Sequence, residues 1–120
     1  SNDVATVTQT ACAENDALYI PTDNTAASCT EAINNVAEPA GVPIVAGEEG
    51  ICKGCGIATL SIDYYELGKT TGAMAAIILT GEANVSDMPI EYYQNPDKKY
   101  NAGICEQLGI TVPSDYTAIG

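Results

Sequence analysis

Seven residues that can bind a small polar or cationic molecule follow three short apolar runs of the sequence. They are Thr22, Asp23 and Asn24 after the first run, Gly47, Glu48 and Glu49 after the second, and Asp63 after the third. Carboxylates bind an ammonium group by charge-assisted hydrogen bonds, and a carboxamide can both donate and accept. The residue types therefore indicate a binding site for a small polar or cationic ligand.

The three apolar runs, residues 17–20, 42–46 and 57–61, are predicted to be strands that bring these side chains together. The carboxyl ends of parallel strands meet at one edge of an α/β sheet, and ligands are commonly held there. We therefore expect the seven residues to gather at a single edge.

Helices and strands are predicted to alternate along the rest of the chain. Helices are expected at 3–13, 25–36, 64–80 and 102–108, short strands at 88–92 and 99–101, a glycine-rich loop at 47–56 and a tail at 109–120. Asp3 is expected to cap the first helix, Asp23 or Asn24 the second, and Gly81 to end the third. This pattern predicts the α/β class, with a mainly parallel sheet flanked by helices.

Composition excludes several classes of function. The 120 residues suit one domain, and 16 acidic residues against four lysines give a net charge of −12. Nucleic acid and anionic membrane surfaces are poor partners for such a chain. The acidity also has a plainer explanation, which is solubility. No histidine is present, so histidine-based catalytic triads and histidine metal sites are excluded within this chain.

The cysteines give no clear cofactor signal. Cys52 and Cys55 form a CxxC pair, which can close a disulfide or supply two metal ligands, but no second CxxC accompanies it. We predict neither a metal site nor a cofactor, and expect the pair to be a local loop disulfide or free thiols. Cys12 and Cys29 are expected to be small buried residues of helices.

Four segments together resemble one known family. YIPTDNT, GVPIVAGEEG, ATLSIDYYELGKTTGAMAAIIL and MPIEYYQNP are similar, in order and spacing, to the tryptophan/tyrosine-binding group of ABC-importer substrate-binding proteins. That family has the type I periplasmic-binding-protein architecture, in which a ligand lies between two α/β lobes. The resemblance implies that residues 1–120 form one lobe, the C-terminal one, with 64–92 passing to a first lobe. The CxxC pair departs from the family pattern.

The resemblance also implies a function without catalysis. The ligand would be an amino acid, tryptophan or tyrosine in this group, and the partners would be ABC permease subunits. The protein would be extracytoplasmic, with a lipoprotein anchor. The family's ligand-facing loops fall on the same seven residues. Cut from a first lobe, the helix spanning 67–79 is expected to pair with a second copy of the chain.

Other interpretations remain open at this stage. Asp23, Asn24 and Asp63 can cap helices, and Glu48 and Glu49 can be solvated loop acids. The residues alone favour capping, whereas the resemblance favours ligand contact for Asp23, Asn24 and Glu48. An effector-sensing domain of a regulator would share the architecture, and paired carboxylates could in principle perform acid–base catalysis.

Overall fold

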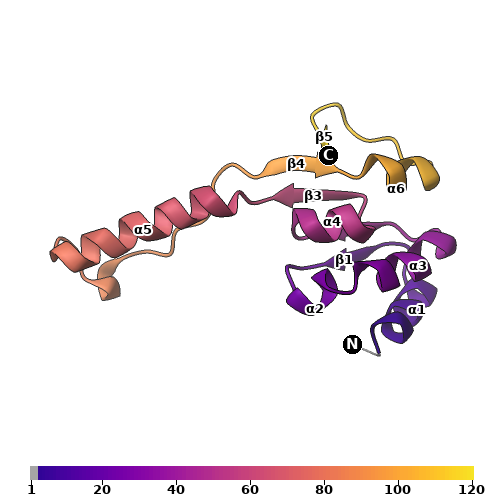
Figure 1. Cartoon of the computed structure of the whole chain (residues 1–120), viewed down its shortest axis with the longest axis horizontal. Helices are drawn as coiled ribbons and strands as arrows, with labels where there is room; N and C mark the ends of the chain where they lie inside the picture. The colour runs from indigo at the N-terminus through magenta and orange to yellow at the C-terminus, as the bar shows by residue number, and fades with distance from the viewer. Residues whose placement is uncertain (1–2) are drawn as a thin grey trace. The chain divides into compact units, whose positions relative to one another are not determined.

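The structure, a computed structural model, describes residues 3–120. Its elements are α1 (Val4–Glu14), β1 (Leu18–Ile20), α2 (Asn24–Ala27), α3 (Thr30–Ala40), β2 (Ile44–Ala46), α4 (Glu49–Cys55), β3 (Ala58–Ser61), α5 (Tyr64–Thr80), the 3-10 turn η1 (Val85–Asp87), β4 (Asp97–Tyr100), α6 (Ala102–Gln107) and β5 (Thr117–Ala118) (Figure 1). They form two compact units. We call Ile62–Pro96 the helical unit and the remainder the sheet unit.

The sheet unit is built on a five-stranded sheet in the order β1-β2-β3-β4-β5. Strands β1, β2 and β3 run parallel, β4 is antiparallel to β3, and β5 is parallel to β4. The register pairs Tyr19 with Val45 and Val45 with Ala58. This mainly parallel sheet with its flanking helices confirms the predicted fold class.

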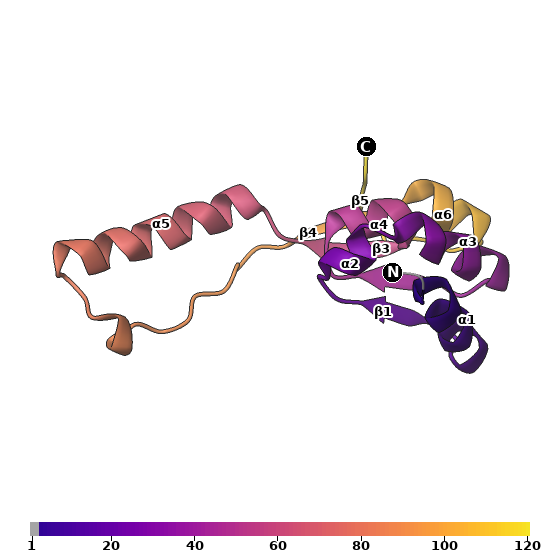
Figure 2. The same cartoon turned by 60° about the horizontal axis from the view of Figure 1, so that its bottom comes forward.

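Helices cover one face of this sheet. Right-handed crossovers between parallel strands that follow in sequence order place α2, α3 and α4 on the same side, as Figure 2 shows. Their apolar residues form the core with alternate residues of β2, and this core consists of Ile33, Ala37, Ile44, Ala46, Ile51, Cys52 and Cys55. Val4 and Cys12 of α1 pack against the same cluster. The core therefore lies between the helices and a single face of the sheet.

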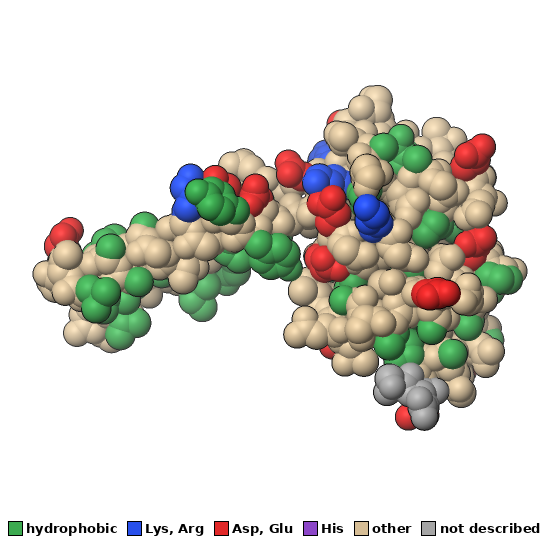
Figure 3. Space-filling view, in the orientation of Figure 1, with side chains coloured by type: hydrophobic (Ala, Val, Ile, Leu, Met, Phe, Trp, Pro, Cys, Tyr) green, Lys and Arg blue, Asp and Glu red, His purple; other side chains and the backbone are tan. Residues whose placement is uncertain are grey.

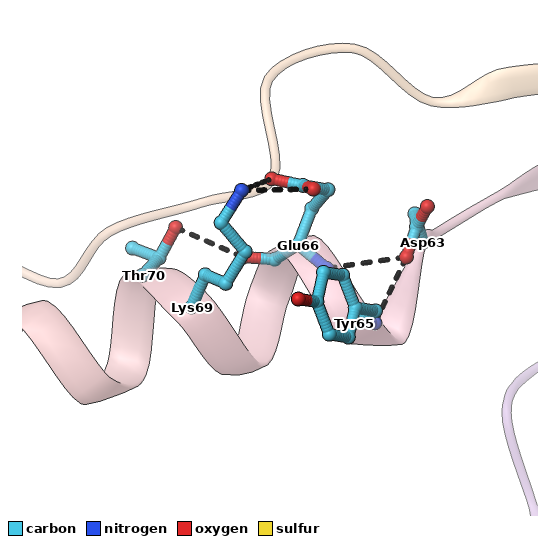
Figure 4. A network of polar contacts seen from close by, with 5 residues as sticks. All are labelled: Asp63, Tyr65, Glu66, Lys69 and Thr70. Carbon is cyan, nitrogen blue, oxygen red and sulfur yellow. Dashed lines mark hydrogen bonds and ion pairs between the residues drawn. The ribbon is translucent and has the colours of Figure 1, made fainter.

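The helical unit consists of α5 and the segment that follows it. Asp63 Oδ1 accepts hydrogen bonds from the amides of Tyr65 and Glu66 (Figure 4). Gly81, with φ of 78°, ends the helix. Glu66 and Lys69 form an ion pair of 3.0 Å one turn further on. The sequence predicted both ends of α5. No helix within residues 3–120 is long and apolar enough to cross a membrane.

Several sequence-based predictions of local structure were wrong. Residues 49–55 form helix α4 instead of a loop, and the predicted helix 25–36 is two helices, because the backbone leaves the helical region at Cys29. Residues 88–92 form no strand, and the predicted tail contains β5. Asp3 precedes α1, but its side chain makes no capping hydrogen bond.

Candidate functional site

The ends of β1 and β2 lie side by side at the carboxyl edge of the sheet. The amide of Gly47 donates to Ile20 O at 2.8 Å, and the Thr22 hydroxyl donates to Gly47 O at 3.4 Å. A Cβ atom on Gly47 would lie 2.8 Å from Thr22 N, so the close approach of the two loops requires glycine there. Thr22 and Gly47 are therefore brought together, as predicted.

Asp23 and Glu48 occupy equivalent positions in these two loops, and each caps the helix that follows. Asp23 Oδ1 accepts from Ala26 N at 2.8 Å at the start of α2. At the start of α4, the two carboxylate oxygens of Glu48 accept from the amides of Gly50 and Ile51. The capping interpretation is thus correct for Asp23, whereas the cap that Glu48 makes was not predicted, since Glu48 was interpreted as a ligand contact or a solvated loop acid. Asn24 is the first residue of α2 and is exposed.

Glu49 forms an ion pair with Lys99. Its Oε2 lies 2.6 Å from Lys99 Nζ of β4 and 3.5 Å from Ser61 Oγ at the end of β3. The Lys99 side chain is only 28% exposed, so this ion pair is better shielded from solvent than a typical surface pair. Lys99 is a site residue that the sequence did not indicate, because fifty positions separate it from Glu49.

Asp63 belongs to the helical unit, where it caps α5. The sheet unit by itself therefore brings together the other six predicted residues: Thr22, Asp23, Asn24, Gly47, Glu48 and Glu49. A role for Asp63 in binding stays a prediction.

This edge can bind a cationic group without losing its helix caps. An ionised carboxylate has about four acceptor positions on its two oxygens, so a side chain that accepts one or two amide hydrogen bonds can still accept others. Asp23 is exposed and Glu48 is half-buried. Because Lys99 neutralises Glu49, Asp23 and Glu48 are the carboxylates of this edge best placed for an ammonium group.

The CxxC pair lies inside the protein, on the helix α4 that Glu48 caps. All five cysteines are free thiols, and Cys52, Cys55 and Cys105 are buried. Burial raises the pKa of Cys52 to about 12 and that of Cys55 to about 11, and it also raises the pKa of Cys105. The prediction of a loop was wrong, because the pair belongs to α4. Cys12 and Cys29 are only partly buried. Residues 3–120 hold no group of three or more side chains suited to a metal ion.

We expect the buried thiols to resist alkylation. The thiolate is the reactive form, and a raised pKa together with burial suppresses it. Iodoacetamide at about pH 8 should modify Cys29 in the folded protein, whereas Cys52, Cys55 and Cys105 should react only after urea is added. Peptide mass spectrometry measures each site separately. Equal rates at Cys29 and Cys52 would contradict the packing of α4.

The same thiols predict the direction of a pH effect on folding. Their pKa values in the folded protein lie above the ordinary value of 9.0, so folding favours the neutral form. Their contribution to stability is complete below about pH 9 and is lost as the pH rises through 11 to 12.

Solved structures contain folds similar to this chain. A ligand-free, open substrate-binding protein with adhesive properties from Clostridium difficile is 33% identical over 98% of the chain, with a TM-score of 0.74. An ABC domain in complex with L-Trp from Streptococcus pneumonia is 29% identical over 94% of the chain, with a TM-score of 0.79. A conserved domain protein from Vibrio cholerae is 30% identical over 98%, with a TM-score of 0.81.

The comparisons also show how much of these relatives the chain represents. A tyrosine-binding protein from Clostridioides difficile is 39% identical over 75 residues, which are 62% of this chain and 21% of that protein. The chain spans 38–40% of the three solved chains. The family model for ABC transporter substrate binding proteins matches residues 1–118. The chain therefore belongs to the family of ABC transporter substrate-binding proteins.

Proposed function

We propose that this chain forms one lobe of a two-lobe receptor that binds an aromatic amino acid and delivers it to the permease of an ABC importer. The observation that carries the proposal is the edge where β1 and β2 end, at which Thr22 and Gly47 meet and Asp23 and Glu48 follow. A tyrosine-binding relative and an L-Trp-bound neighbour support an aromatic ligand. The family match supports transport over the effector-sensing alternative.

The geometry supports specific roles at this edge. Asp23 and Glu48 would accept hydrogen bonds from the ligand's ammonium group, and Thr22 and Asn24 would bind its other polar atoms. Glu49, paired with Lys99 and close to Ser61, would hold the start of α4 in place. Asp63 would be a further ligand contact. Members of this family are in general binding proteins and not enzymes.

Location and partners follow from the same proposal. A receptor that serves an importer works outside the cytoplasmic membrane, and a lipid anchor would keep it close to its permease. Residues 64–92, which lie in the helical unit, would pass to the first lobe. Closure of two lobes on a ligand combines contacts from both halves, so neither half alone reaches the affinity of the closed receptor.

Calorimetry tests this proposal on two polypeptides. The 120-residue chain should bind L-tyrosine or L-tryptophan no better than about 1 mM, which corresponds to about −4 kcal/mol. A two-lobe protein, in which residues 1–120 replace the matching segment of the open substrate-binding protein from Clostridium difficile, should bind them at least about 100-fold more tightly. L-lysine and L-leucine serve as controls. Micromolar binding by the 120-residue chain would contradict the two-lobe proposal, and failure of the two-lobe protein to prefer aromatic amino acids would contradict the ligand.

A further inference from the structure

One lysine lies among the carboxylates of the candidate edge, and its pairing sets how much negative charge that edge presents. Asp23 follows β1, Glu48 follows β2, and Glu49 lies beside Ser61 at the end of β3. Lys99 pairs with the last of these carboxylates, that of Glu49. Figure 3 shows acidic and lysine side chains gathered over the part of the sheet unit where Figure 1 places α4 and β4. The edge therefore offers a ligand the charge of two carboxylates, those of Asp23 and Glu48, and not of three.

Contacts at both ends of α4 keep this ion pair in place. Lys99 and Asn101 are two residues apart in extended backbone, so their side chains point to the same face of the sheet, on which α4 packs. The Asn101 side chain donates to Cys52 O at 3.2 Å and to Lys53 O at 2.9 Å, near the end of the helix. Because Asn101 anchors this end of α4, Glu49 at the other end stays within reach of Lys99.

The charge of Lys99 affects a zwitterionic ligand and a cationic ligand differently. An amino acid carries an ammonium group and a carboxylate, whereas its amide carries only the ammonium group. A third unneutralised carboxylate at the edge would attract the ammonium group of both ligands but would repel the carboxylate of the amino acid. We propose that Lys99 is a specificity-determining residue, which neutralises Glu49 and so favours the zwitterionic amino acid over its cationic derivatives. The role assigned to Lys99 rests on the proposed function, because it concerns the same binding edge.

Calorimetry of the two-lobe protein tests this role through the preference for L-tyrosine over L-tyrosinamide, measured at about pH 6, where both ligands carry an ammonium group. Lys99→Met leaves Glu49 charged and unneutralised, so the preference should fall by about tenfold. Glu49→Gln leaves the Lys99 cation uncompensated, so the preference should rise by about tenfold. The variant with both substitutions restores the net charge of the pair, and its preference should return to that of the parent. A loss of packing alone would not shift the preference in opposite directions.

Lys98→Met is the matched control for net charge. Lys98 precedes Lys99 in β4, so its side chain points to the opposite face of the sheet, and it pairs with Asp115. Its replacement changes the net charge of the chain by the same amount as Lys99→Met. The preference for L-tyrosine over its amide should stay that of the parent. A thermal melt of each variant shows whether it is folded.

The possible results distinguish a wrong role for Lys99 from a wrong function for the chain. The two-lobe protein could bind L-tyrosine with a preference that is the same in Lys99→Met and Glu49→Gln, or that shifts in the same direction in both. Lys99 then has no such role, and the proposed function stands. If a different amino acid binds best, the proposed ligand is wrong, and that amino acid and its amide test Lys99 instead. A two-lobe protein that binds no amino acid contradicts both proposals. If Lys99→Met unfolds, Glu49→Gln and the double variant decide the role of Lys99.

Discussion

Replacing Gly54 by alanine is expected to lower the free energy of unfolding by about 2–3 kcal/mol. Gly54 lies in α4 where that helix meets the start of α3. An added Cβ would lie 2.3 Å from Thr30 Oγ1 and 2.4 Å from Thr30 Cβ. Rotation about χ1 moves the hydroxyl but not Cβ, which is fixed to the backbone. The two helices must therefore move apart, which loosens the core that they share.

Gly103→Ala is the matched control for this prediction. Gly103 also lies in a helix of the sheet unit, and its nearest atom to an added Cβ, Asn101 Oδ1, is at an ordinary 3.6 Å. Alanine should stabilise that helix by about 0.5–1 kcal/mol. Urea denaturation followed by circular dichroism measures both variants. A Gly54→Ala variant that unfolds at the same urea concentration as the parent would show that α3 and α4 are not in close contact.

Elements with strong local signals could be predicted from the sequence. Helix α5 has a side-chain cap at Asp63, a long apolar centre, and Gly81 in the left-handed conformation at its end. The three parallel strands are apolar runs that stop at polar residues. In each case the local residues and the tertiary environment favour the same structure.

Helix α4 was missed because its stability comes from packing and not from local propensity. Gly50 and Gly54 make its seven residues poor helix formers. The helix forms because Ile51, Cys52 and Cys55 are buried against the core. Two signals could have revealed it: an acidic residue, Glu49, in the first turn, and apolar residues at helical spacing after it.

The prediction of a strand at 88–92 failed for the opposite reason. The apolar residues of this segment alternate with others as in a strand, but Ile90 and Tyr92 are 77% and 73% exposed. A strand requires a neighbouring strand, and none pairs with this segment among residues 3–120. Alternation alone could not supply that partner.

At the candidate site, the sequence located the residues but not their contacts. Strand ends placed Asp23 and Glu48 at one edge, and the cap that Asp23 makes was foreseen as an alternative, whereas the cap that Glu48 makes was not. The ion pair between Glu49 and Lys99 depends on β4 lying antiparallel to β3. Sequence spacing carries no information about that pairing, so the neutralisation of Glu49 could not be predicted.

In the two-lobe protein, Asp23→Asn and Glu48→Gln are each expected to weaken aromatic amino-acid binding by about 10- to 150-fold, the loss of about 1.5–3 kcal/mol for a hydrogen bond to a charged group. Asparagine caps helices about as well as aspartate, so Asp23→Asn removes the charge while keeping the cap of α2. The melting temperature of this variant should therefore change little. Calorimetry gives the affinity, and a thermal melt gives the stability of the same sample.

Two further variants distinguish the effect of the Asp23 charge on binding from the effect of its helix cap on stability. They are Asp16→Asn and Asp23→Ala. Asp16 precedes β1, at the opposite end of the strand from Asp23, so its replacement changes the net charge equally without touching the candidate site. Ligand affinity should be unchanged in Asp16→Asn. Asp23→Ala removes both functions, and it should lose the same affinity as Asp23→Asn together with about 1 kcal/mol of stability. Asp23→Asn could bind the ligand as tightly as the parent, and Asp23→Ala could differ from the parent only in a lower melting temperature. In that case Asp23 is a helix cap and the ammonium group is bound elsewhere.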